Sequence, residues 1–290
     1  MRYGVIYKGS KNQIAEWVYK QFPVRENFYD LFAGGCALTQ LALMRNEFKN
    51  LYCNDIDGDG INLFVDATAG KFANENRWIG REDFFALKDK EPLIKYLWSF
   101  GNNGRDYLYA KDIEPYKGAC HYAVMFNDFE PARKLGMFLL EKQLQENKKD
   151  ITRLQHLQML RSLQSLESIK NIDKINFSFK DYAGIEIKEN SVIYCDPPYF
   201  QTNPYIEGAG GSFDHERFYD WCCKQKEFCF ISEYYMPEDR FVCIGGIEKN
   251  VLICSGGDKK NIERLFIPKH QEEMYRRWKV EEGGFLFDFL

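Results

Sequence analysis

The sequence predicts an α/β fold in which a parallel-type sheet is interrupted by a mostly helical insert. Short apolar runs alternate with helical patterns at both ends of the 290-residue chain, separated by glycine, proline and asparagine turns. Between about residues 71 and 170 the strand patterns thin out and polar helical patterns take over. We therefore expect one domain built from residues 1–70 and 171–290, with a second domain inserted at residues 71–170.

The first 70 residues have the pattern of a β-α-β-α unit that follows a short helix. Residues Ile14–Phe22 are spaced like an amphipathic helix that Pro23 ends, and the apolar run Phe28–Phe32 is typical of a buried strand. This strand leads into a turn at Ala33–Gly35. The unit continues with a helix over Ala37–Arg45, a strand over Leu51–Cys53 and a helix over Gly58–Ala69.

The rest of the chain supplies the insert and the second half of the sheet. Helical patterns cover Phe84–Trp98, Ala132–Lys148 and Ile151–Ile169. Further strands are predicted at Ile175–Phe179, Val192–Cys195, Phe228–Ser232, Phe241–Ile244 and Val251–Cys254. A glycine-rich loop at Glu207–Ser212 precedes a helix that Asp214 opens.

Composition and charge exclude several classes of protein. The chain is 45% hydrophobic and 28% charged, as in folded proteins, and no apolar run approaches the roughly 18 residues of a membrane span. Its start is basic but lacks the apolar stretch of a secretory signal, so we expect an intracellular, cytoplasmic protein. The net charge is −4, yet residues 71–170 hold 17 Lys and Arg against 14 Asp and Glu. A DNA-binding face would therefore be local.

No metal site is predicted. The nine cysteines include no C-x-x-C pair, and the four histidines show no metal spacing, so both are expected to serve packing or the surface. Asp55, Asp57, Asp59 and Gly60 fit the first half of a calcium loop, but its twelfth position is Asp66, where a bidentate glutamate is expected. We expect no calcium there.

The sharpest motif is Asp196-Pro197-Pro198-Tyr199, directly after the apolar strand that ends at Cys195. Open α/β sheets place their active sites at this end of the strands. The two prolines fix the backbone and offer carbonyl acceptors without N–H donors, so an exocyclic amine of a planar base would fit between the carboxylate and the Pro197 carbonyl. Tyr199 could stack on that base. A proline-stiffened strand exit with a capping aspartate remains an equal alternative for the tetrapeptide alone.

This motif resembles the catalytic motif of amino-group DNA methyltransferases, and its neighbours resemble the DNA adenine methylase (Dam) family, phage members included. Tyr29–Gly35 resembles the family's first cofactor motif, Asn54–Ile56 its second, and Tyr7–Lys11 its N-terminal motif. Their order, with Lys180-Asp181-Tyr182 before Asp196, is also that of the family. The resemblance implies a Rossmann-like S-adenosylmethionine-dependent methyltransferase fold, with residues 71–170 as an inserted target-recognition domain.

By the same resemblance, S-adenosylmethionine is the cofactor. Residues expected to bind it are Tyr7, Lys11, Phe32, Gly34, Gly35, Asp55, Asp181 and Asp196. Two of these expectations also have physical reasons. Gly34 and Gly35, between a strand and a helix, let backbone N–H groups approach an anion. Asp55 lies 20 residues past Gly35, the offset at which an acidic residue accepts from ribose hydroxyls.

The segment Trp98–Tyr109 in the insert is predicted to be a hairpin with a Gly/Asn turn. Its side chains Asn102, Asn103, Arg105 and Tyr107 are of the types that read base edges or stack on an unpaired base. Similar hairpins of the Dam family enter DNA, so the resemblance implies DNA binding here. An ordinary polar turn is the alternative.

The predicted function is therefore transfer of a methyl group from S-adenosylmethionine to N6 of an adenine flipped out of double-stranded DNA. Asp196, Pro197, Pro198 and Tyr199 are the expected catalytic residues. We expect a site-specific monomeric enzyme of a bacterial or phage-infected cell, of the kind also found in restriction–modification systems. Alternatives are methylation of cytosine N4, which usually has Ser at the position of Asp196, methylation of RNA adenine, and a DNA-binding module without activity.

Overall fold

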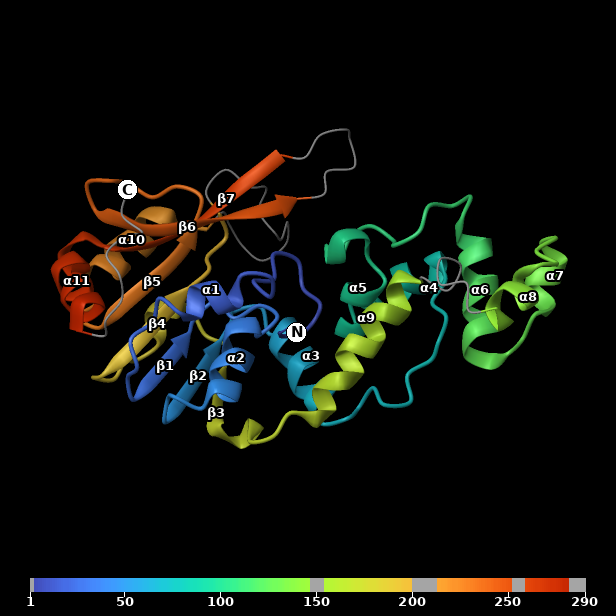
Figure 1. Cartoon of the computed structure of the whole chain (residues 1–290), viewed down its shortest axis with the longest axis horizontal. Coiled ribbons are helices and arrows are strands. Elements are labelled where there is room, and N and C mark those ends of the chain that lie inside the picture. The colour runs from blue at the N-terminus through green and yellow to red at the C-terminus, as the bar shows by residue number, and fades with distance from the viewer. Residues whose placement is uncertain (1–2, 147–153, 200–212, 252–258, 282–290) are drawn as a thin grey trace. The chain divides into compact units, whose positions relative to one another are not determined.

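The computed structural model describes residues 3–146, 154–199, 213–251 and 259–281 (Figure 1). The chain divides into two compact units. We call them the sheet unit (residues 11–33, 37–57 and 173–290) and the helical unit (residues 1–10, 34–36 and 58–172).

The sheet unit is built around seven strands in the order β3-β2-β1-β4-β5-β7-β6. The strands are β1 (Asn27–Asp30), β2 (Asn50–Asn54), β3 (Ile175–Ser178), β4 (Ser191–Cys195), β5 (Phe228–Glu233), β6 (Phe241–Val251) and β7 (Lys259–Pro268). Strands β1 to β5 run parallel, whereas β7 is antiparallel to both β5 and β6. Figure 1 shows β6 and β7 as a pair of long arrows. The mixed α/β architecture confirms the predicted Rossmann-like fold.

The strand order reverses between β1 and β4, and this places the ends of these strands side by side. Both strands are buried along their whole length, as expected of parallel strands covered on two faces. Asp30 at the end of β1 lies opposite Tyr194, and the Leu31 N–H donates to the Tyr194 carbonyl over 3.0 Å. Ligands of open α/β sheets bind at such a point of reversal.

Helices of the sheet unit are α1 (Ala15–Tyr19), α2 (Ala37–Arg45), α10 (His215–Cys223) and α11 (Glu272–Glu281). The α2 bounds equal the predicted ones, and Asp214 caps α10 as predicted by accepting from the Arg217 N–H over 3.0 Å. The core beneath them is rich in aromatic rings. Tyr29 stacks on Tyr52 with ring centroids 4.3 Å apart.

The helical unit contains α3 (Asp59–Thr68), α4 (Arg81–Leu87), α5 (Pro92–Leu97), α6 (Glu114–Phe126), α7 (Glu130–Lys134), α8 (Leu140–Gln145) and α9 (Gln155–Gln164). A chain of buried polar side chains runs through it. His156 bonds through one ring nitrogen to the Tyr109 hydroxyl at 2.8 Å and through the other to His121 at 2.9 Å, while His121 also bonds to the Asn76 carbonyl. Burial lowers the pKa of both imidazoles. These two histidines are packing residues, as expected.

Several predicted helices and strands differ from the observed ones. The helix predicted over Phe84–Trp98 is two helices, because the chain breaks before Pro92, which starts α5. The helix predicted over Ala132–Lys148 is likewise broken at Gly136, which has φ of +75°. The sequence prediction missed α6, β7 and α11.

Other predictions lie wholly or partly outside the described residues. These are the glycine-rich loop Glu207–Ser212, most of the strand predicted at Val251–Cys254, the end of the helix predicted over Ala132–Lys148 and the start of the helix predicted over Ile151–Ile169. The strand predicted at Phe241–Ile244 is the first part of the longer β6.

Candidate active site

The Asp196–Tyr199 segment follows β4 without a break and starts at the point of strand reversal. Lys11 Nζ lies 2.6 Å from Asp196 Oδ2 and donates to it. The side chains are 6% and 17% exposed, so this ion pair is largely shielded from water. Such a charge-assisted hydrogen bond fixes the orientation of the carboxylate. The structure therefore brings together two residues that were predicted separately.

A second carboxylate, which the sequence prediction missed, lies in the same cluster. Glu263 on β7 is 1% exposed, and its Oε1 lies 3.4 Å from Lys11 Nζ. The Tyr199 hydroxyl donates to the same oxygen. Burial raises the pKa of Tyr199 well above its usual value, and the Asp196 and Glu263 carboxylates raise it further, so the hydroxyl keeps its proton.

Asp30 is the second residue that the prediction did not single out, although it lies within the quoted cofactor motif. Its Oδ2 accepts from the N–H and the hydroxyl of Thr39 at the start of α2, over 3.2 and 2.7 Å. Its Oδ1 is buried and has no hydrogen-bond partner in the described structure. Burial raises the pKa of Asp30 to about 7, with further upward contributions from Asp196 and Asp55. The Asp196 and Asp55 carboxylates thus act electrostatically on Asp30.

Asp55 follows β2 and accepts from the Asp57 N–H over 2.9 Å. The residue before it, Asn54, is buried and ties three chain segments together. Its amide donates to the carbonyls of Leu31 and Lys180, and its side-chain oxygen accepts from the Lys180 N–H. These bonds fix the strand ends next to which Asp55 lies.

Asp181 and Phe32 are also in the sheet unit. Asp181 caps a short 3₁₀ turn and forms a bidentate ion pair with Arg217, with distances of 2.8 and 2.9 Å. Hydrogen bonds from Arg217 lower the pKa of Asp181. The half-buried ring of Phe32 packs 5.3 Å from Tyr182 and edge-on against Phe218.

Tyr7, Gly34 and Gly35 belong to the helical unit. Gly34 has φ of +46°, and a Cβ there would lie 3.0 Å from the Tyr7 ring. The Val5 N–H donates to the Gly35 carbonyl over 2.8 Å, and a Cβ on Gly35 would lie only 2.8 Å from the Val5 carbonyl oxygen. The turn therefore requires glycine at both positions.

The Trp98–Tyr109 segment folds back on itself with a single β-bridge between Ser99 and Tyr107 and a 3₁₀ turn, instead of the predicted hairpin strands. Asn102 donates to the Tyr96 carbonyl, and the Asn103 side chain accepts from two backbone N–H groups within the turn. The two asparagines thus hold the loop in place.

The remaining two residues of this segment differ in exposure. Tyr107 is 5% exposed, and its hydroxyl donates to the Ile79 carbonyl. Among the four predicted DNA-binding residues of this segment, Arg105 is the one with an exposed side chain.

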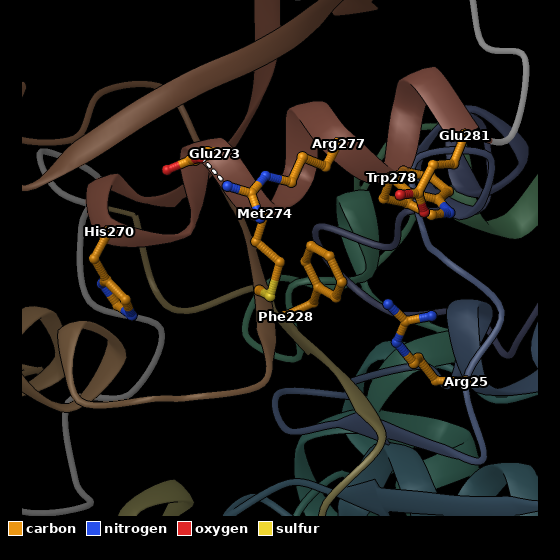
Figure 2. Close-up of a pocket in the computed structure, with 8 residues that line it drawn as sticks. All are labelled: Arg25, Phe228, His270, Glu273, Met274, Arg277, Trp278 and Glu281. Atoms are coloured by element: carbon orange, nitrogen blue, oxygen red, sulfur yellow. Dashed lines mark hydrogen bonds and ion pairs between the residues drawn. The ribbon is translucent and has the colours of Figure 1, made fainter.

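An open pocket of about 600 Å³ lies beside α11 (Figure 2). It is lined by Arg25, Phe228, His270, Glu273, Met274, Arg277, Trp278 and Glu281. Figure 2 shows Arg277 paired with Glu273 on the same helix, one turn apart. None of the predicted site residues lines this pocket.

The described residues contain no group of three or more His, Cys, Asp or Glu side chains placed to hold a metal ion. No helix among them is long and apolar enough to cross a membrane.

The comparison with protein families assigns the chain. Residues 7–232 match the family described as D12 class N6 adenine-specific DNA methyltransferase, a range that contains every predicted site residue. No match is found among curated proteins. Because the match covers most of the chain and agrees with the α/β fold, the protein belongs to the D12 class of N6 adenine-specific DNA methyltransferases.

Proposed function

We propose that this enzyme takes the methyl group for N6 of adenine from S-adenosylmethionine, and that the adenine is flipped out of duplex DNA against the Asp196–Tyr199 loop. The observation that carries the proposal is the shielded Lys11–Asp196 ion pair at the end of β4, next to the end of β1. It fixes a carboxylate at the point of the sheet where ligands of this fold class bind.

The chemistry of the residues at the strand ends fits such a methyl donor. Asp30, Asp55 and Asp196 follow or end β1, β2 and β4, and the buried Asp30 Oδ1 has no partner in the described structure. Carboxylates at this edge favour a ligand that is positively charged and rich in hydrogen-bond donors. S-adenosylmethionine has a sulfonium charge and ribose hydroxyls, and supplies the electrophilic methyl group when bound. Asp55 would accept from the ribose, Asp181 would lie near the adenine ring, and Phe32 would line the cofactor site.

Asp196 and the Pro197 carbonyl would each accept one hydrogen of the target amine. This orients the nitrogen lone pair towards the methyl group, and such positioning supplies much of the rate enhancement in transfer reactions. Positive charge that develops on the amine is stabilised by these fixed acceptors. Pro198 keeps the loop rigid, and the Tyr199 ring offers a face for stacking.

In the helical unit, Tyr7 and the Gly34–Gly35 turn are proposed to bind the cofactor, as the sequence predicts. Gly34 has φ of +46°, and glycine turns of this left-handed kind between a strand and a helix can bind a carboxylate through backbone N–H groups.

For residues 71–170 we keep the role of target-recognition domain for double-stranded DNA. Lys8 and Arg105 support it, because burial and the nearby Arg105 charge both lower the pKa of Lys8, which indicates two cations in proximity. Like charges that are held together suit a phosphate backbone. Arg105 would contact DNA, while Asn102, Asn103 and Tyr107 would hold the loop that presents it.

The proposal is tested by incubating the protein with methyl-labelled S-adenosylmethionine and either unmethylated duplex DNA or RNA. The DNA is then digested and the labelled nucleoside identified. We expect N6-methyladenine from DNA, no label in RNA, and loss of transfer in Asp196→Ala. Asp239→Ala, which removes an exposed carboxylate of the same unit, is the matched control and should keep the activity. Label in RNA or in N4-methylcytosine, or substantial activity of a folded Asp196→Ala variant, would overturn the assignment.

A further inference from the structure

We propose that Glu263 on β7 is a positioning residue for methyl transfer, which holds the Tyr199 hydroxyl and the Lys11 ammonium so that Asp196 keeps its reactive orientation. This inference rests on the proposed function of the Asp196–Tyr199 loop. It extends the functional residues beyond the matched family range, which ends at residue 232.

Hydrogen bonds connect the side chains of this cluster. Glu263 Oε1 accepts from the Tyr199 hydroxyl and lies 3.4 Å from Lys11 Nζ, while Lys11 donates to Asp196 Oδ2 over 2.6 Å. Lys11 Nζ also lies 4.9 Å from the centroid of the Tyr199 ring. The two ends of the catalytic loop, Asp196 and Tyr199, are therefore joined through Lys11 and Glu263.

The charges of this cluster are buried. Glu263 is 1% exposed and Lys11 is 6% exposed, so neither charge is compensated by bulk water. Removal of one member of a buried charge pair leaves the other poorly compensated, so the positions of these groups depend on one another. The formal charge of Lys11, Asp196 and Glu263 together is −1. With Glu263 present, the ammonium is shared between two carboxylates.

The strand that carries Glu263 is held in place by its own contacts. In the antiparallel pair β5–β7, Arg264 lies opposite Glu233, and its guanidinium donates to the Tyr234 carbonyl over 2.7 Å. The Tyr234 ring packs edge-on against Tyr199, with centroids 4.7 Å apart. Strand β7 thus contacts the catalytic loop by two routes, one polar through Glu263 and one through the Arg264–Tyr234 contact. Residues on strands hold such geometry better than residues on loops.

The test is single-turnover methyl transfer by the full-length Glu263→Gln variant at saturating DNA and S-adenosylmethionine. Glutamine keeps the size and an acceptor oxygen but removes the charge. We expect the transfer rate to fall about 10- to 100-fold, since a displacement of about 1 Å in a reacting group has an effect of that order. The melting temperature and the Kd for S-adenosylmethionine, measured by calorimetry, should change little by comparison.

Glu248→Gln is the matched control, because Glu248 is an exposed glutamate on the adjacent strand β6. It makes the same change in net charge and should leave the rate within about twofold of the wild-type rate. A wild-type rate in folded Glu263→Gln would overturn the inference.

A double-mutant cycle of Tyr199→Phe with Glu263→Leu, which removes both acceptor oxygens, separates positioning from a purely structural role. Phenylalanine keeps the stacking face and removes only the hydroxyl that binds Glu263. If Glu263 acts through that hydroxyl, the double variant should be no slower than the slower single variant. Additive rate losses would overturn the inference. Should Glu263→Gln not fold, Tyr199→Phe alone decides: a rate loss of fivefold or more supports the inference, and a wild-type rate refutes it.

Failure of the proposed function would look different. In that case the wild-type enzyme would transfer no methyl group to DNA, or Asp196→Ala would remain active. An active wild type with an inactive Asp196→Ala variant and a normal Glu263→Gln variant would refute the role of Glu263 alone.

Discussion

Replacement of Gly60 by alanine tests how closely α3 must approach the glycine turn of the helical unit. A Cβ on Gly60 would lie 2.1 Å from the Gly34 carbonyl oxygen and 2.7 Å from its carbon. Ordinary contact begins near 3.4 Å, so the backbone would have to separate by about 1.3 Å. The contact is with backbone atoms, the carbonyl group of Gly34, and Gly60 itself is held in the first turn of α3. The clash therefore cannot be relieved by a side-chain rotation.

The expected free-energy change is the difference between two effects. Alanine in a helix is favoured over glycine by about 1 kcal/mol. Overpacking of a tight contact costs about 1 to 3 kcal/mol, and a backbone clash belongs at the upper end of this range. We expect Gly60→Ala to lower the free energy of unfolding by about 2 kcal/mol. Because the Gly34–Gly35 turn is proposed to bind the cofactor, its displacement should also weaken S-adenosylmethionine binding about tenfold.

Urea denaturation and calorimetric titration with S-adenosylmethionine measure the two effects. Gly184→Ala is the matched control, because a Cβ at Gly184 meets nothing within 4 Å and its φ is not in the left-handed region. That variant should be neutral or stabilised by up to about 1 kcal/mol. A Gly60→Ala variant as stable as the wild type, with the same Kd, would refute the reasoning from close approach.

Two pH-dependent predictions have opposite signs. Burial raises the pKa of Asp30 from 3.8 to about 7, so the folded state binds the proton more tightly, and its stability contribution is lost as the pH rises from about 4 through 7. The free energy of unfolding of the wild type, measured by urea denaturation, should therefore fall by about 2 to 3 kcal/mol from pH 5 to pH 8, and Asp30→Asn should not show this fall. An equal fall in the variant would contradict the pKa shift. Burial lowers the pKa of His156 from 6.5 to about 3, so stability is lost as the pH falls below 6.5 towards 3. His156→Phe should lose stability less steeply than the wild type as the pH falls. At pH 7 it should be less stable by about 1 to 3 kcal/mol, because the Tyr109 hydroxyl and His121 lose their hydrogen-bond partner. An unchanged acid transition, measured by circular dichroism, would argue against the pKa shift of His156.

The sequence predicted the parts of the site whose chemistry is local. Asp196–Tyr199 is contiguous and follows an apolar run, so its residue types and its place at a strand end could be recognised together. Glu263 could not be recognised in this way. Its partners Lys11 and Tyr199 are remote in sequence, and a glutamate one residue from an arginine on a strand has the pattern of an ordinary exposed position. Its burial, at 1% exposed, becomes apparent only in the fold, where β7 lies between β5 and β6.

The same reasoning explains the missed helix α6 (Glu114–Phe126). Its buried face consists largely of small residues, Gly118, Ala119, Cys120 and Ala123, together with His121. Larger apolar side chains such as Tyr122 and Phe126 are exposed instead. Periodicity of large apolar residues is the main sign of an amphipathic helix, and this helix reverses it. Helices that pack through small residues are therefore hard to find in a single sequence.

The acidic run at residues 55–60 shows how a structural role can imitate a metal motif. In the sheet unit, Asp55 accepts from the Asp57 N–H, a bond that shapes the turn after β2. In the helical unit, Asp59 opens α3 and pairs with Lys95 Nζ at 2.5 Å, while Gly60 lies against the Gly34 carbonyl. Asp55, Asp59 and Gly60 thus each have a reason for their residue type that involves no cation. Half of a calcium loop arises here because a turn, a helix start and a close backbone contact follow one another within six residues.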